Sequence, residues 1–74
     1  MNILIENAET LEYLGANGKW SKKPANGTPF ATTHVALAAA KNETIGKFNI
    51  VSYIPETEQF INLEHGTGKG ASSV

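Results

Sequence analysis

The residues of this chain that are able to carry out acid–base or metal chemistry are few and far apart. The imidazoles are His34 and His65, and Glu64 is the one carboxylate directly beside an imidazole. A zinc site needs three or four converging ligands, and the sequence has no cysteine to supply thiolate ligands. Nucleophilic catalysis needs a hydroxyl or thiol held against a base, and no spacing marks such a pair. We therefore predict no metal site, no cofactor and no catalytic residue.

The segment HGTGKGASS, residues 65–73, has part of the composition of a phosphate-binding loop. The P-loop pattern requires a serine or threonine directly after its lysine, and then a helix that holds the phosphate at its N-terminus. Here Gly70 follows Lys69. The small and polar residues 66–74 instead predict a disordered C-terminal tail.

One segment combines positive charge with the only tryptophan, namely Lys19-Trp20-Ser21-Lys22-Lys23. Such a cluster is able to hold single-stranded nucleic acid by contacting phosphates and stacking bases. Alternatively, the tryptophan packs on a sheet while the lysines keep a strand edge soluble. The chain has net charge −1, and it lacks arginine, the preferred residue for phosphate recognition. We expect the structural role, and keep Lys19, Trp20, Lys22 and Lys23 as candidates for nucleic-acid binding.

The elements that must position these residues centre on one helix, predicted over Phe30–Lys41, FATTHVALAAAK. Alanine is the best helix former, and Thr32 and Thr33 are both good N-cap residues. Gly46 lies where a left-handed residue often ends a helix. The predicted apolar stripe consists of Ala36, Leu37 and Ala40.

Short strands are predicted before the helix. In Asn2–Asn7, Ile3 and Ile5 share one face and Leu4 lies on the other. Thr10–Gly15 is expected to be a second strand, with a short helix over residues 8–15 as the alternative.

The dipeptide Asn17-Gly18 predicts a type I′ turn between the second strand and a third. A two-residue loop at this turn would place Leu14 opposite Ser21 and Glu12 opposite Lys23. The third strand is expected over Lys19–Lys23, followed by a surface loop over Pro24–Pro29.

Two strands are predicted after the helix, over Phe48–Ile54 and Gln59–Glu64, with a four-residue turn between them. This register places Ile54 opposite Gln59 and Ile50 opposite Leu63. One face of the hairpin then carries Phe48, Ile50, Ile54, Ile61 and Leu63. The other face carries Val51, Tyr53 and Phe60.

Both faces of this hairpin are apolar, and a single helix covers only one of them. The second face is closed either within the chain, by Trp20, Tyr13 and Leu11, or by another chain across a twofold axis. A contiguous exposed aromatic patch needs an explanation. We therefore expect a homodimer, or docking of another protein, with Val51, Tyr53 and Phe60 as the self-association candidates.

These elements predict an α+β fold, with one α-helix on an antiparallel sheet of four or five strands in the order β-β-β-α-β-β. Residues 1–65 form one small domain. No apolar run approaches the roughly 20 residues of a membrane span, and MNILIENAET lacks the basic start of a signal peptide. We expect a cytoplasmic, non-catalytic interaction or structural module, with a weak single-stranded nucleic-acid-binding protein as the alternative.

Overall fold

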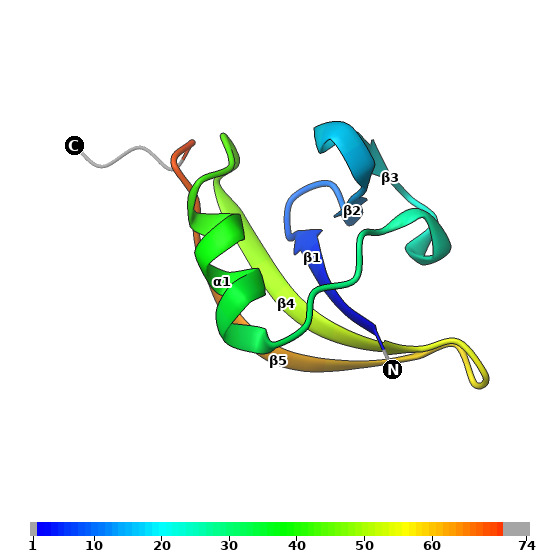
Figure 1. Cartoon of the computed structure of the whole chain (residues 1–74). Coiled ribbons are helices and arrows are strands. Elements are labelled where there is room, and N and C mark those ends of the chain that lie inside the picture. The colour runs from blue at the N-terminus through cyan, green and yellow to red at the C-terminus, as the bar shows by residue number, and fades with distance from the viewer. Residues whose placement is uncertain (1, 71–74) are drawn as a thin grey trace.

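The structure is a computed structural model that describes residues 2–70. Within these residues, one α-helix lies on one face of a five-stranded antiparallel sheet, as predicted (Figure 1). No helix in this part of the chain is long and apolar enough to cross a membrane. The helix is α1 (Thr33–Lys41), and the strands are β1 (Asn2–Asn7), β2 (Glu12–Leu14), β3 (Trp20–Ser21), β4 (Lys47–Ile54) and β5 (Gln59–Thr67).

The strands lie in the order β3-β2-β1-β4-β5, so the long strands β1 and β4 are central and β5 forms one edge. The segment after the short 3-10 helix Pro24–Asn26 adds to the opposite side of the sheet. There Thr28 donates its backbone N–H to the carbonyl of Leu14, and Phe30 donates to Ile3. This segment fills the gap where β1 and β2 diverge, so that side of the sheet is largely paired.

The helix begins at Thr33 rather than at Phe30, because Phe30 is drawn into a β-bridge with Ile3. Thr32 is the N-cap, and its Oγ1 accepts from the backbone N–H of Val35 at 3.1 Å. The helix ends at Lys41, as predicted, but Gly46 does not stop it, because the C-cap residue is Asn42 in a right-handed conformation.

The main core lies between α1 and the sheet. Ala36 and Ala40 of the predicted stripe are fully buried, whereas Leu37 is only partly buried at the edge of the cluster. Small alanine side chains let the helix approach the strands closely. The buried members of this core are Ile5, Leu14, Ala36, Ala40, Phe48 and Ile50.

Residues 12–14 form the predicted strand, and the helical alternative for residues 8–15 is wrong. Asn17 and Gly18 have φ values of 60° and 72°, the positive values that a type I′ turn requires. The predicted register is wrong by one residue, since Leu14 lies opposite Trp20 rather than Ser21. The Gly15 N–H donates to the Lys19 carbonyl, which adds a residue to the loop, so Glu12 does not face Lys23.

The predicted pairing of β4 with β5 is confirmed next to the turn, where Ile54 lies opposite Gln59. It fails farther along, because a bulge at Leu63 places Ile50 opposite Glu64. β5 also runs to Thr67, beyond the expected end at Glu64.

The expected boundary of the domain at residue 65 is therefore too early. After β5, the Gly68 N–H donates to the Gly46 carbonyl and the Lys69 N–H donates to the Glu43 carbonyl. Residues 66–70 belong to the fold, and residues 71–74 of the predicted tail lie outside the described residues.

The hydroxyl of Ser52 generates a prediction about stability. Ser52 is 1 % exposed, and within residues 2–70 its Oγ has no hydrogen-bond partner. A buried hydroxyl without a partner costs folding free energy. Ser52→Ala should therefore raise the free energy of unfolding by about 1 kcal/mol, measured by urea denaturation.

Ser21→Ala is the matched control for this substitution. The Ser21 Oγ accepts from the Lys23 N–H at 3.1 Å and from Asn26 Nδ2 at 3.2 Å. Its removal should leave stability unchanged or lower it by up to about 1 kcal/mol. If Ser52→Ala destabilises the chain more than Ser21→Ala does, Ser52 is hydrogen-bonded in solution and the prediction fails.

Candidate functional site

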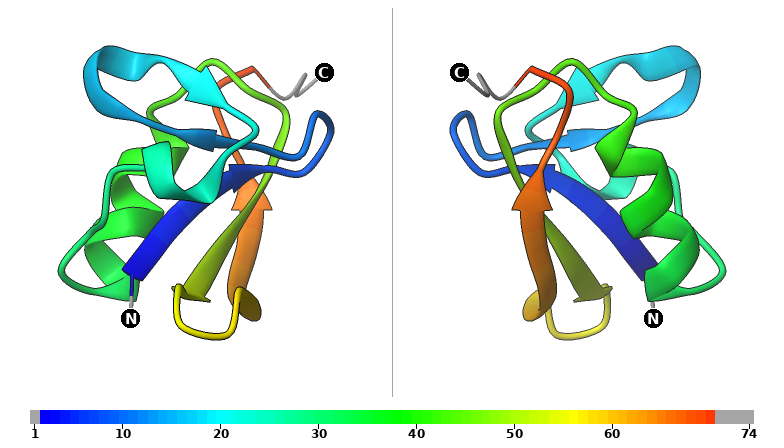
Figure 2. Two further views of the ribbon diagram at one scale, coloured as in Figure 1. Left: turned by 90° about the vertical axis from the view of Figure 1, so that its right-hand side faces the viewer. Right: turned by 90° about the vertical axis from the view of Figure 1, so that its left-hand side faces the viewer.

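The face of the sheet opposite α1 is closed by an aromatic cluster from three strands. Tyr53 and Phe60 lie side by side on β4 and β5, with ring centroids 4.9 Å apart. Tyr13 of β2 stacks on the same Phe60 ring, at 5.7 Å and an interplanar angle of 10°. Because β1 and β4 separate β2 from β5, this contact requires a curled sheet, and the views in Figure 2 show its strong twist.

This cluster decides what the self-association candidates expose. Val51 is 4 % exposed and Tyr53 is 8 % exposed, packed with Leu4 and Tyr13 of the same chain. Only Phe60, at 43 %, offers a large exposed area. Closure within the chain thus describes most of this face. Of the three side chains expected to close it, Trp20, Tyr13 and Leu11, only Tyr13 does so. The role of Val51, Tyr53 and Phe60 in association stays a prediction.

A carboxylate lies at the buried phenol of this cluster. Glu6 Oε1 accepts a hydrogen bond from Asn49 Nδ2 at 3.1 Å. Burial and, after it, the nearby negative charge of Glu6 raise the pKa of Tyr13 from 10.0 to about 12. The phenol therefore stays protonated at a pH where an exposed tyrosine would already ionise.

The basic segment lies at the other edge of the sheet. Lys19, Lys22 and Lys23 are exposed, whereas Trp20 is half-buried and packs against the core under α1. A ring held against the core presents less of its face to a nucleic-acid base than a free ring does. The arrangement favours the structural interpretation, in which the lysines keep the edge strand β3 from pairing with another chain.

The candidate metal ligands do not form a cluster. His34 is exposed at the start of α1, while Glu64 and His65 are exposed on β5. Within residues 2–70, no group of three or more potential ligands is placed to hold a metal ion.

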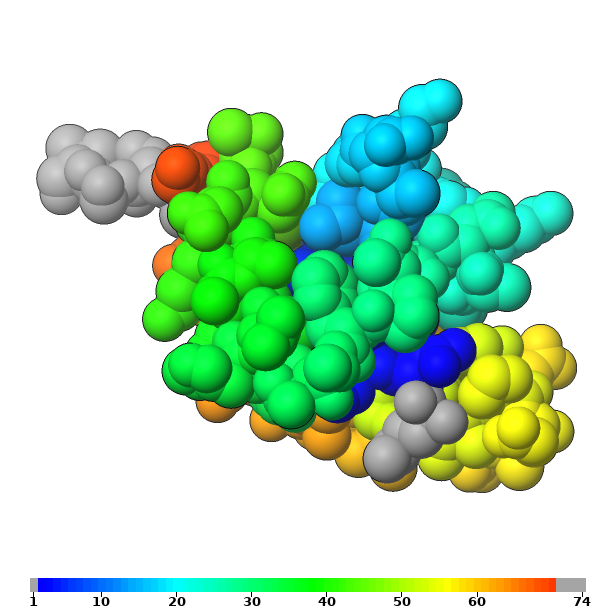
Figure 3. All heavy atoms as spheres, viewed as in Figure 1, coloured from blue at the N-terminus to red at the C-terminus, as the bar shows by residue number. Residues whose placement is uncertain are grey.

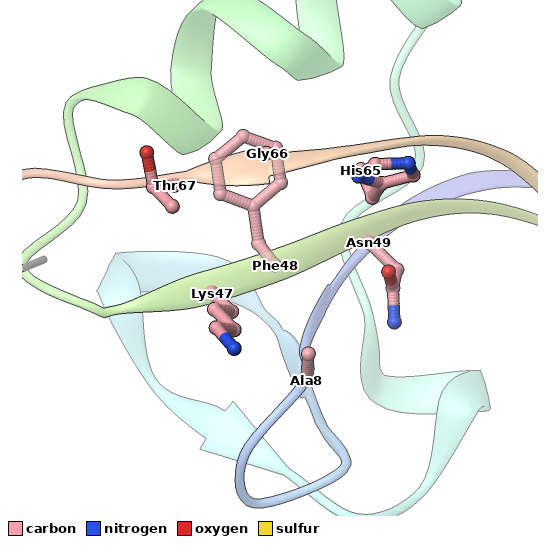
Figure 4. A pocket seen from close by; sticks show the side chains of 7 residues that line it. All are labelled: Ala8, Lys47, Phe48, Asn49, His65, Gly66 and Thr67. Atoms are coloured by element: carbon pink, nitrogen blue, oxygen red, sulfur yellow. The ribbon is translucent and has the colours of Figure 1, made fainter.

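An open pocket of about 330 Å³ lies where β4 and β5 pass the turn after β1 (Figure 4). Its polar lining comes from Lys47, Asn49, His65 and Thr67. Asn49 is already engaged by Glu6, and no hydrogen bond among the described residues joins the imidazole of His65 to a hydroxyl. The pocket therefore does not define a reaction.

The outer edge of β5 is the most distinctive exposed feature of the described chain. Phe60, Ile61 and Leu63 are 43 %, 49 % and 41 % exposed. Figure 3 shows that α1, together with the segment before it, covers this face of the sheet and that β5 is visible mainly along the rim. Glu64 is the only carboxylate on the strand, which has no lysine and no proline.

The sequence interpretation missed this edge because it placed Ile61 and Leu63 in the core under the helix. The available signal was the run Gln59–Leu63, which lacks the charges and prolines that normally protect an edge strand.

Comparison of the chain with protein-family models, with curated proteins and with solved structures gives no match. The site is therefore interpreted from its own residues and geometry.

The raised pKa of Tyr13 predicts a loss of stability at high pH. The folded state holds the phenolic proton up to about pH 12, whereas the unfolded state releases it near pH 10.0. The stabilisation is complete below pH 10.0 and is lost as the pH rises toward 12. At about 1.4 kcal/mol per pKa unit, this loss is at most about 3 kcal/mol.

Tyr13→Phe removes the titrating group and keeps the ring, so it provides the control. Urea melts from pH 8 to about 12 should show a steeper fall in the wild type than in this variant. Parallel curves for the two proteins would show that the Tyr13 phenol does not contribute.

Proposed function

We propose that the protein is a small non-catalytic interaction module that self-associates through the outer edge of β5. The observation that supports this proposal is the exposed, nearly uncharged edge of a nine-residue strand. The unpaired N–H and C=O groups of an edge strand are a template for pairing with another chain.

The two edges of the sheet differ in a way that favours β5. β3 has only two residues, and the exposed Lys19 and Lys22 flank it. Short strands and lysines are features that protect edges from pairing. Ile61 and Leu63 lie on the opposite edge, that of β5. Pairing of this edge with a strand of another chain would remove part of their side chains from water.

A second copy suits this edge better than a nucleic acid does. The stretch Gln59–Leu63 carries no charge, so no like charges oppose each other within it, whereas nucleic-acid binding rests largely on cationic contacts to phosphate. A contact between two copies of Gln59–Leu63 involves far fewer residues than the roughly 20–30 that each partner contributes to a standard interface. We therefore expect reversible association of modest affinity. The absence of cysteine suits a reducing compartment, and the proposal places the module in the cytoplasm.

Ile61→Lys tests the proposal, because an edge lysine blocks strand pairing while its side chain remains in water. Wild-type protein should show a concentration-dependent monomer–dimer equilibrium in sedimentation. Ile61→Lys should raise the Kd of the dimer at least about 10-fold, which corresponds to about 1.4 kcal/mol of binding free energy. Circular dichroism should show an unchanged fold.

Leu11→Lys makes the same change of charge at another exposed apolar side chain, 61 % exposed in the turn before β2. Its association should match that of the wild type. Equal weakening by both substitutions would point to a general charge effect, and a strictly monomeric wild type would contradict the proposal.

A further inference from the structure

One hydrogen bond establishes the direction in which the backbone groups of β4 point. The Ala8 N–H donates to the Lys47 carbonyl at 3.0 Å, so the polar backbone groups of Lys47 point toward β1. These directions alternate along an antiparallel strand. The backbone groups of Phe48, Ile50, Ser52 and Ile54 therefore point toward β5.

A second hydrogen bond supports this assignment from the other side of β1. The Phe30 N–H donates to the Ile3 carbonyl at 2.8 Å, so the backbone groups of Ile3 point away from β4. Ile3 lies opposite Ser52. The backbone groups of Ser52 must then point away from β1 and toward β5.

The same alternation defines the open edge of β5. Ile61 lies opposite Ser52 and is bonded to β4, so the backbone groups of Phe60 and Asn62 point outward. The bulge at Leu63 shifts the alternation, because Glu64 lies opposite Ile50 and points inward.

Beyond the bulge, the next outward N–H is already occupied. The backbone N–H of His65 donates to the Oε1 of Glu64 at 3.1 Å. The bulge and this side-chain cap therefore limit the open edge to Gln59–Leu63, where Phe60 and Asn62 are the outward-pointing residues.

We propose that β5 pairs antiparallel with β5 of a second copy about a twofold axis that passes between the two Ile61 residues. This inference rests on the proposed self-association. Phe60 then lies opposite Asn62 of the second copy, and Asn62 lies opposite Phe60. Each of these pairs exchanges two N–H···O hydrogen bonds.

Other twofold registers use the edge less well. An axis at Asn62 would place Phe60 opposite Glu64, whose backbone groups point toward β4. An axis at Phe60 would place Asn62 opposite Glu58, a turn residue with φ 54°. Only the axis at Ile61 matches both outward residues with outward residues.

The register also accounts for the exposed side chains. The two Ile61 residues form a non-hydrogen-bonded pair with Cα atoms about 4.5 Å apart, and Leu63 lies opposite the uncharged Gln59. The axis is perpendicular to the sheet, so both α1 helices lie on the same face.

Cysteine cross-linking tests the register without interference, because the chain has no cysteine of its own. Ile61→Cys should form an intermolecular disulfide under copper–phenanthroline oxidation, since the Cα separation lies in the range that a disulfide spans. Leu63→Cys is the control. Its symmetry mate is about four residues away along the strands, roughly 13 Å, so at least 10-fold less cross-linked dimer is expected.

A mixture of two single variants makes the register unambiguous. Gln59→Cys and Leu63→Cys should each cross-link poorly alone, but together they should give a mixed disulfide dimer identified by its mass. Efficient cross-linking of Leu63→Cys with little for Ile61→Cys would overturn the register and leave self-association standing. A wild-type chain that sediments as a monomer up to about 1 mM, the level of a binding free energy near −4 kcal/mol, would remove both proposals.

Discussion

The structure depends on the limited area of the sheet that α1, the only α-helix among the described residues, is able to cover. α1 has nine residues and four alanines, so it lies close to the sheet but buries little surface of its own. It contacts β1, β4 and β5, and its most deeply buried side chains are Ala36 and Ala40. The rest of the apolar surface has to be covered by something else or remain exposed. Each of the other features of the fold follows from that requirement.

On the face away from the helix, the apolar surface is covered because the sheet curls and brings its own aromatic side chains together. Stacked and tilted aromatic pairs add stability beyond the burial of their area, and Phe60 takes part in both of the pairs with Tyr13 and Tyr53. Phe60 is thus both part of the chain's own cluster and an exposed edge residue. The curl brings the aromatic cluster to the edge of β5 and leaves the outer side of that strand uncovered.

The α+β class, the helix and the order of the elements along the chain were predictable because each rests on local signals. The consecutive apolar residues of β1, the alanines of α1 and the Asn17-Gly18 turn are each local signals, because each acts within a few residues of the chain. The bulge at Leu63 was not predictable, since its position depends on how β5 follows the twist of β4. Composition also misled at the C-terminal end of β5. Gly66 predicted disorder, but a Cβ there would lie 2.9 Å from the Phe48 ring, so the glycine permits close packing.

The site was predictable only in part. Sequence periodicity identified the second apolar face and Phe60, but it could not show that Tyr13 reaches across β1 and β4 to stack on Phe60. Nor could it show which apolar residues the helix leaves uncovered, because that depends on where α1 lies over the sheet. The Lys19–Lys23 segment shows the same limit, since its half-buried tryptophan is defined by tertiary packing.

Hydrogen exchange at individual amides tests most directly whether the β5 edge pairs with a second copy. The Ile61 N–H is bonded to β4, so it should exchange slowly at every protein concentration. The Phe60 and Asn62 N–H groups point outward in a single copy, so their exchange should be fast in dilute solution and should slow as the concentration rises. Exchange at Phe60 and Asn62 that stays fast and independent of concentration would contradict pairing through this edge.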